Sequence, residues 1–211
     1  MTPEEFIRAN SELMPSPLVP EIKLHLATEV VPLWRKTEEE LNKMGVPPPY
    51  WAFAWAGGQA LARYILDHPE IVRDRSVLDF GAGSGLVALA AAKAGAAKVL
   101  AADIDKFSIA AIAANAQANG LDIATTSDDI IGSKEAFDVI LVGDMCYERP
   151  LAERLMEWLK NRHTEILLGD PGRSYFPKQG LERLAVYNVA VTRELEDREI
   201  RETGVWKLMS H

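Results

Sequence analysis

Cysteine is nearly absent from the 211-residue sequence, and the single Cys146 cannot form an internal disulfide. The four histidines are scattered without the spacing of metal ligands, so we expect no metal site. Long apolar runs are missing too. The longest, Leu86 to Ala92, falls far short of the ~20 residues that cross a bilayer, and we expect no membrane association.

Basic residues are outnumbered, with 23 Lys and Arg against 31 Asp and Glu, which gives a net charge of −8. An acidic chain binds the phosphate backbone poorly, so we expect no nucleic-acid partner. The N-terminus resembles neither a signal peptide nor an Arg-rich transit peptide, which favours a cytoplasmic location. An acidic surface suits a cationic partner, such as a lysine-bearing protein.

Proline is scarce after residue 50, because eight of the 12 prolines precede it. Proline fixes φ and removes a hydrogen-bond donor, so it opposes regular helices and central strands. We therefore predict an N-terminal extension, residues 1–50, that packs on a catalytic domain, residues 51–211. Within the extension, the pattern predicts a half-buried strand at 22–26 and a short helix at 33–44.

Helical and strand patterns alternate from residue 57 onward. The predicted strands are 76–80, 98–102, one near 123, 138–142 and 165–168, and the helices are 57–68, 86–94, 106–119 and 149–162. A short helix is expected at 179–184, before two β-rich runs, 186–192 and 205–208, that can form an antiparallel hairpin. The sequence thus predicts an α/β fold with a seven-stranded, mostly parallel, doubly wound sheet and an antiparallel edge hairpin.

The most informative segment is a glycine-rich loop that follows an apolar strand. It contains Gly81, Gly83 and Gly85, preceded by Asp79. Alternate glycines let the backbone approach a ligand, and the next helix begins with free N–H groups. A dinucleotide fingerprint would need glycine where Leu86 stands. The pattern resembles motif I of class I S-adenosylmethionine-dependent methyltransferases, which implies that cofactor and a cofactor-binding role for these four residues.

Three further residues are assigned to the cofactor. Asp103 ends the next strand about 20 residues after the glycines, where a carboxylate can accept ribose hydroxyls. We prefer it to Asp105, which is expected to cap the following helix. Asp129 follows the third strand, where the family has its adenine loop, and Asp128 stays open as an alternative. Trp55 is placed near the cationic methyl donor, with ordinary core packing as the other interpretation.

The fourth strand leads into Asp144-Met-Cys-Tyr147 at the carboxyl edge of the sheet, where ligands bind in open α/β folds. Asp144 and Tyr147 resemble the D-x-x-Y motif of the seven-β-strand protein-lysine methyltransferases of family 16. The resemblance implies that Asp144 holds the acceptor nitrogen and that Tyr147 packs against it or caps the site. The alternatives are a helix cap for Asp144 and core packing for Tyr147. Cys146 is expected to be a buried small hydrophobe.

Together, P-P-Y-W-A-F-A-W, D-F-G-A-G-S-G, A-D-I-D, D-M-C-Y and G-D-P-G-R-S-Y resemble the lysine methyltransferases of the electron transfer flavoprotein β subunit. The resemblance covers about residues 18 to 208, with Ala56 in place of an expected proline. It implies a Rossmann-like methyltransferase fold and methyl transfer from S-adenosylmethionine to lysines of that subunit. For bacterial members it also implies a ribosomal stalk protein as substrate. We expect a monomer.

Three other functions stay open from the sequence. A small-molecule N-methyltransferase would use the same cofactor loop, because fold does not fix function. A nucleotide-cofactor oxidoreductase and a non-catalytic cofactor-binding protein are the remaining alternatives.

Overall fold

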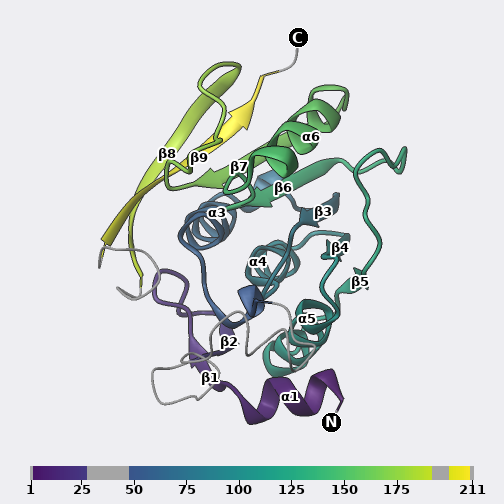
Figure 1. The fold of residues 1–211 in the computed structure, drawn as a ribbon, viewed down its shortest axis with the longest axis vertical. Coiled ribbons are helices and arrows are strands. Elements are labelled where there is room, and N and C mark those ends of the chain that lie inside the picture. Colours follow the sequence, from purple (N-terminus) through teal and green to yellow (C-terminus); the bar gives the residue numbers. More distant parts are fainter. Residues whose placement is uncertain (1, 28–47, 192–199, 210–211) are drawn as a thin grey trace.

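The computed structural model describes residues 2–27, 48–191 and 200–209. At its centre lies a seven-stranded sheet with the order β5-β4-β3-β6-β7-β9-β8 (Figure 1). The five parallel strands are β3 (Ser76–Phe80), β4 (Lys98–Ala102), β5 (Ala124–Thr126), β6 (Val139–Gly143) and β7 (Glu165–Asp170). Strand β9 (Ile200–Leu208) runs antiparallel to β7, and β8 (Leu181–Ala190) runs antiparallel to β9. The predicted fold and its edge hairpin are confirmed.

Helices cover both faces of the sheet, which explains why the central strands are almost continuously apolar. Helices α3 (Ala56–Asp67), α4 (Leu86–Lys93) and α5 (Lys106–Asn119) pack on one face, where Leu61, Leu89 and Ile112 join one hydrophobic cluster. Helix α6 (Arg149–Lys160) packs on the other face through Leu155 and Leu159. Short 3₁₀ turns, η2 (Tyr50–Ala52) and η3 (Pro69–Ile71), flank α3.

The N-terminal segment contributes to the same core. Helix α1 (Pro3–Ala9) precedes a two-stranded antiparallel sheet of β1 (Glu12–Pro15) and β2 (Lys23–Leu26). The buried side chains of Ile22 and Leu24 belong to the cluster under α3 and α4, which confirms the predicted strand. The predicted helix at 33–44 lies outside the described residues. The domain boundary at residue 50 stays a prediction.

One secondary-structure prediction is wrong. Residues 181–184 begin β8 instead of ending a helix, and Leu181 pairs with Leu208 of β9. Leu-Glu-Arg-Leu has good helix propensity, but propensity is a weak preference, and the ladder to β9 overrides it. Within the described residues, no helix is long and apolar enough to cross a membrane.

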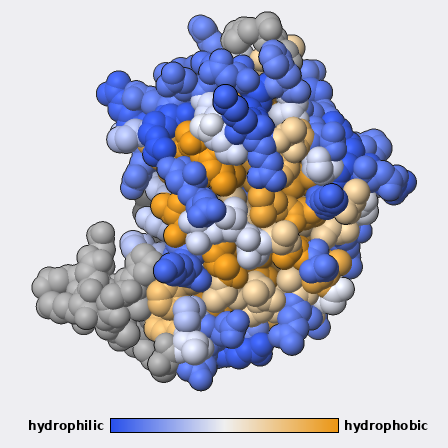
Figure 2. All heavy atoms as spheres, turned by 90° about the vertical axis from the view of Figure 1, so that its right-hand side faces the viewer, coloured by the Kyte–Doolittle hydropathy of each residue, from blue (hydrophilic) through white to orange (hydrophobic). Residues whose placement is uncertain are grey.

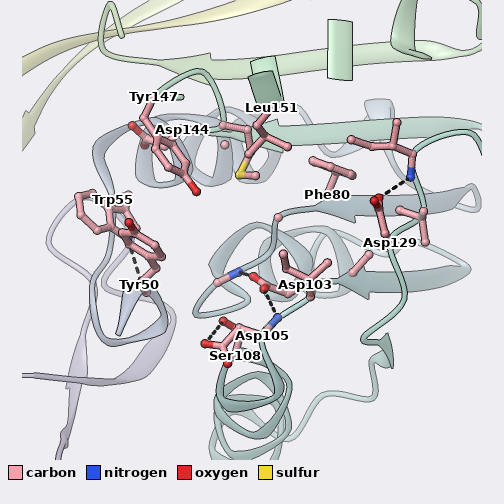
Figure 3. A pocket seen from close by; sticks show the side chains of 18 of the residues that line it. Tyr50, Trp55, Phe80, Asp103, Asp105, Ser108, Asp129, Asp144, Tyr147 and Leu151 are labelled. Atoms are coloured by element: carbon pink, nitrogen blue, oxygen red, sulfur yellow. Dashed lines mark hydrogen bonds between the residues drawn. The ribbon is translucent and has the colours of Figure 1, made fainter. Parts of the chain in front are cut away.

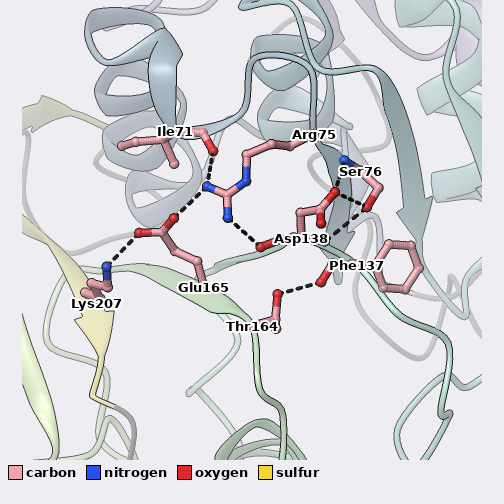
Figure 4. Close-up of polar contacts among 8 residues, drawn as sticks. All are labelled: Ile71, Arg75, Ser76, Phe137, Asp138, Thr164, Glu165 and Lys207. Atoms are coloured by element: carbon pink, nitrogen blue, oxygen red, sulfur yellow. Dashed lines mark hydrogen bonds and ion pairs between the residues drawn. The ribbon is translucent and has the colours of Figure 1, made fainter.

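Charged side chains join the strands at their amino ends (Figure 4). Glu165, the first residue of β7, accepts hydrogen bonds from Arg75 Nη1 and from Lys207 Nζ of β9, both at 2.7 Å. Arg75 also donates to the Asp138 carbonyl at 2.9 Å, just before β6. These contacts connect the antiparallel edge of the sheet to the parallel strands.

Candidate functional site

A cavity of about 400 Å³ opens at the carboxyl ends of β3, β4 and β6. That volume falls within the roughly 300–1,000 Å³ of small-molecule sites. Figure 3 shows Tyr50, Trp55, Asp144 and Tyr147 at one end of the cavity, Asp129 at the other, and Asp103 between them. The cavity is therefore elongated and has a different chemistry at each end.

The glycine loop forms part of the cavity wall. Gly81, Gly83 and Gly85 have φ angles of 65°, 51° and 79°, a region that L side chains rarely adopt. A Cβ at Gly81 would also collide with the Met145 thioether. The loop therefore depends on glycine, and Gly81 and Gly83 both line the cavity.

Asp103 is fixed by two backbone donors. Its Oδ2 accepts from Gly83 N at 2.8 Å and its Oδ1 from Asp105 N at 2.9 Å. Burial raises the pKa of Asp103, and these two N–H groups oppose the shift. A carboxylate has about four lone-pair positions, so Asp103 retains capacity to accept a hydroxyl group from a ligand. Asp105 caps α5 by accepting from Phe107 N, as expected.

The predicted cofactor residues Asp79 and Gly85 are not among the described residues that line the cavity. Asp79 is 1% exposed, and its carboxylate accepts from Ala88 N in α4 at 2.9 Å. Gly85 is the N-cap residue of α4, where a Cβ would crowd Ile112. Both residues position the glycine loop against the helix, and the cavity surface is formed by their neighbours.

Asp128 and Asp129 both line the far end of the cavity. Asp129 accepts from Arg154 Nη2 and from Ile131 N, and the bond from Arg154 holds the pKa of the carboxyl below its usual value. The Asp129 carboxylate is thus fixed by a side chain from α6, whereas the Asp128 carboxylate accepts from Thr126 Oγ1, two residues earlier in the sequence.

Aromatic rings gather at the near end. The Tyr50 ring lies 6.0 Å from Trp55 and 5.8 Å from Tyr147, measured between centroids. Tyr147 is 39% exposed, so it is not a core residue. Burial, as the largest cause, and the nearby Tyr50 raise the pKa of Tyr147 to about 12, so the phenol stays neutral. Such rings can contact a cation.

Asp144 sits at the end of β6 and is 8% exposed. Its φ of 57° places it in the left-handed region, which Asp tolerates better than most residues. Oδ2 accepts from Gly57 N and from Gly58 N at the start of α3. Oδ1 accepts from Arg173 Nε at 2.9 Å and pairs with Arg173 Nη2 at 2.7 Å. The carboxylate thus caps α3, whereas sequence reasoning offered the following helix.

The sequence analysis assigned no role to several residues that line the cavity. Arg173 stands in the Gly/Pro loop after β7, which entered the sequence analysis only as part of the family resemblance, and Tyr50, Met145 and Ser108 had no assigned role. The one usable signal for Arg173 was a cation close to the start of a loop that leaves the carboxyl end of a central strand. Cys146 is buried, and burial raises the pKa of its thiol to about 12, as expected for an inert cysteine.

Hydrophobic residues gather near the middle of the face shown in Figure 2, with hydrophilic residues around them. Among the exposed large hydrophobic side chains, Tyr50, Ile104 and Tyr147 line the cavity. In the part of the chain that the structure describes, no group of three or more His, Cys, Asp or Glu residues could hold a metal ion.

Comparisons with known proteins point to methyltransferases. A family model described as "Ribosomal protein L11 methyltransferase (PrmA)" matches residues 59–160. The "Electron transfer flavoprotein beta subunit lysine methyltransferase" of Danio rerio is 40% identical over 215 residues, which cover 97% of this chain and 82% of that protein.

Solved structures share the fold. The ribosomal protein L11 methylase from Lactobacillus delbrueckii subsp. bulgaricus has a TM-score of 0.53 at 24% identity and covers 74% of this chain and 79% of that chain. The magnesium protoporphyrin IX methyltransferase of Synechocystis PCC 6803, solved with bound SAM, has a TM-score of 0.54 at 15% identity over 73% of this chain and 78% of that chain.

Proposed function

Because the chain belongs to the family of electron transfer flavoprotein β subunit lysine methyltransferases, we propose that its acceptor is that subunit in its own cell. The chain is an S-adenosylmethionine-dependent protein-lysine methyltransferase. A ribosomal protein is a second candidate acceptor, favoured by the description of the matched family model. The relatives favour lysine over a small-molecule acceptor and over the two alternatives without methyl transfer.

The cavity fits the cofactor. Gly81 and Gly83 leave their backbone open to the ligand, and Asp103 retains acceptor capacity for the ribose hydroxyls. Asp129 would face the adenine, and Trp55 would lie near the sulfonium. Bound S-adenosylmethionine supplies an electrophilic methyl group on a cationic sulfur. These assignments are supported by the order of the residues along the cavity.

The acceptor end of the cavity is built for a cation. Asp144 would hold the lysine ammonium by a charge-assisted hydrogen bond and then orient the neutral amine. Free lysine has a pKa of ~10.4, and only the neutral amine has a lone pair to react, so a proton must leave to water first. Tyr147 and Tyr50 would limit water access around the nitrogen. The observation that carries this proposal is the single cavity that contains both Asp103 and Asp144.

Methylation of purified electron transfer flavoprotein β subunit and of a cell lysate with labelled S-adenosylmethionine tests the function. Labelled product should map to lysine side chains. Asp144→Asn keeps an oxygen for the Gly57 and Gly58 amides but loses the ion pair with Arg173, so it should retain cofactor affinity at some cost in stability while losing about 10²-fold or more in rate. Full activity of Asp144→Asn would contradict the role of Asp144. Labelling only of small molecules would contradict the protein acceptor.

The monomeric state and the cytoplasmic location stay predictions. So do the absence of a nucleic-acid partner and the absence of membrane binding.

A further inference from the structure

Arg173 reaches into the acceptor end of the cavity from the loop after β7. Its guanidinium carbon lies 5.7 Å from the centroid of the Trp55 ring, and its Nε and Nη2 both contact Asp144 Oδ1. The acceptor ammonium was proposed above to bind the same Asp144 carboxylate among neighbouring aromatic rings. Arg173 therefore has the chemistry of the substrate at the substrate's position.

The two oxygens of Asp144 have different tasks. Oδ2 accepts from the Gly57 and Gly58 amides and is part of the helix start. Oδ1 takes both contacts from Arg173. A carboxylate oxygen has about two lone-pair positions, so both positions on Oδ1 are filled. An incoming lysine can bond to Oδ1 only where the guanidinium moves away.

The loop backbone holds Arg173 in place. Asp170 Oδ1 accepts from Gly172 N and from Arg173 N, both at 2.7 Å, and Tyr175 N donates to the Cys146 carbonyl at 3.2 Å. The backbone is therefore fixed on both sides of the arginine. The side chain is 20% exposed, so rotation about its own bonds brings the guanidinium to water. We expect exchange with a substrate to proceed by side-chain rotation, with the loop backbone in place.

We propose that Arg173 is a built-in stand-in for the substrate lysine, occupying the ammonium position in the free enzyme and leaving it when the acceptor binds. The inference rests on the proposed function of Asp144. The stand-in role explains why an arginine lies against Asp144 in the free enzyme. Breaking a buried ion pair by removing one partner is strongly destabilising, so the free enzyme needs a cation against Asp144.

The variant Arg173→Lys tests the position directly. A lysine ends where the guanidinium carbon of arginine lies, between the two nitrogens that contact Oδ1, so its amine should reach the same oxygen. The introduced amine loses a proton to water, its lone pair forms an N–C bond with the methyl group as the S–C bond of S-adenosylmethionine breaks, and S-adenosylhomocysteine leaves. The variant should therefore methylate itself with no substrate present.

Three controls make the result specific. The wild type should gain no methyl group under the same conditions. Arg149→Lys places a lysine on the exposed face of α6, paired with Glu153, and that lysine should stay unmodified. Arg173→Lys combined with Asp144→Asn should lose the self-methylation. Intact-protein mass and peptide mapping report all three, and dilution should not change the fraction modified, because the reaction is intramolecular.

A second experiment uses the wild type without any methyl donor. Arginine side-chain N–H signals are followed by NMR, and Arg173 is assigned by the signal missing in Arg173→Gln. Adding n-butylammonium, a probe for the lysine side chain, should shift the Arg173 signal toward that of a solvent-exposed guanidinium. Neutral 1-butanol and sodium chloride at matched ionic strength should leave it in place. If butylammonium leaves the Arg173 signal unmoved, the proposal is overturned. This experiment uses the wild type, so it decides the matter even if Arg173→Lys fails to fold.

The stand-in role of Arg173 and the proposed function can be contradicted separately. Suppose that the wild type methylates protein lysines, and that Arg173→Lys is folded and binds the cofactor but stays unmodified. The stand-in role is then wrong, and the proposed function holds. If neither the wild type nor Arg173→Lys forms methyl-lysine, the proposed function is wrong as well.

Discussion

At the scale of single residues, Asp103 combines a structural task with a proposed binding task. Its carboxylate receives the Gly83 and Asp105 amides and faces the cavity. We expect Asp103→Ala to weaken S-adenosylmethionine binding about 10-fold to 100-fold, because a hydrogen bond to a charged group contributes ~1.5–3 kcal/mol. Calorimetric titration measures it, with exposed Asp122→Ala as the control of unchanged affinity. Equal affinity in both variants would exclude a contact between Asp103 and the cofactor.

Asp79 should make stability depend on pH. Burial raises its pKa from 3.8 to about 8. Between these pH values the folded state retains a proton that the unfolded state has lost, so the free energy of unfolding falls as pH rises and levels off above about 8. Asp79→Asn cannot titrate and can still accept from Ala88 N.

The melting temperature of Asp79→Asn minus that of the wild type should therefore increase between about pH 4 and about pH 8. Thermal unfolding at several pH values measures this difference. Asp170, whose pKa burial raises to about 7, is present in both proteins and cancels. A difference that stays constant with pH would refute the raised pKa of Asp79.

At the scale of elements, the start of α3 is pressed against the end of β7. A Cβ on Gly57 would collide with the Gly169 carbonyl oxygen, whereas a Cβ on Gly58 would lie 3.9 Å from Val87 Cγ2. We expect Gly57→Ala to destabilise the fold by about 1–3 kcal/mol or more and to impair activity, because the helix start carries the Asp144 cap.

The neighbouring Gly58→Ala is the matched control. It adds the same methyl group in ordinary van der Waals contact with Val87 and should change stability by no more than about 1 kcal/mol, in the favourable direction. Chemical denaturation compares the two variants. Equal stabilities of Gly57→Ala and Gly58→Ala would mean that α3 and β7 have room for a methyl group between them.

The elements also show what the sequence can predict. Strand β6 and the glycine loop were predictable, because apolar runs and alternate glycines are local signals. The start of β8 at Leu181 was not, since its pairing with Leu208 depends on a strand that comes later in the chain. Local preference decides an element only where no distant partner competes for its backbone.

At the scale of the whole molecule, the sequence predicted which end of the sheet carries the site but not how its residues pair. Asp144 was expected at the carboxyl end of the fourth strand and lies there. Its partners Gly57 and Arg173 are 87 and 29 residues away in sequence. Their contact follows from how α3 and the loop after β7 converge, and the sequence contains no local pattern for that convergence.

The net charge of −8 should act on the encounter with a lysine-bearing protein. Raising the ionic strength from about 0.01 M to about 0.15 M shortens the Debye length from about 30 Å to about 8 Å, which screens attraction between an acidic enzyme and a basic patch. We expect kcat/KM for a protein substrate to fall several-fold, while kcat at saturation changes little. A short peptide around the same lysine, with no other charged residue and no extended basic patch, should lose much less of its kcat/KM. Initial rates with both substrates across this salt range provide the measurement, and equal salt dependence would show that long-range charge does not guide this enzyme to its substrate.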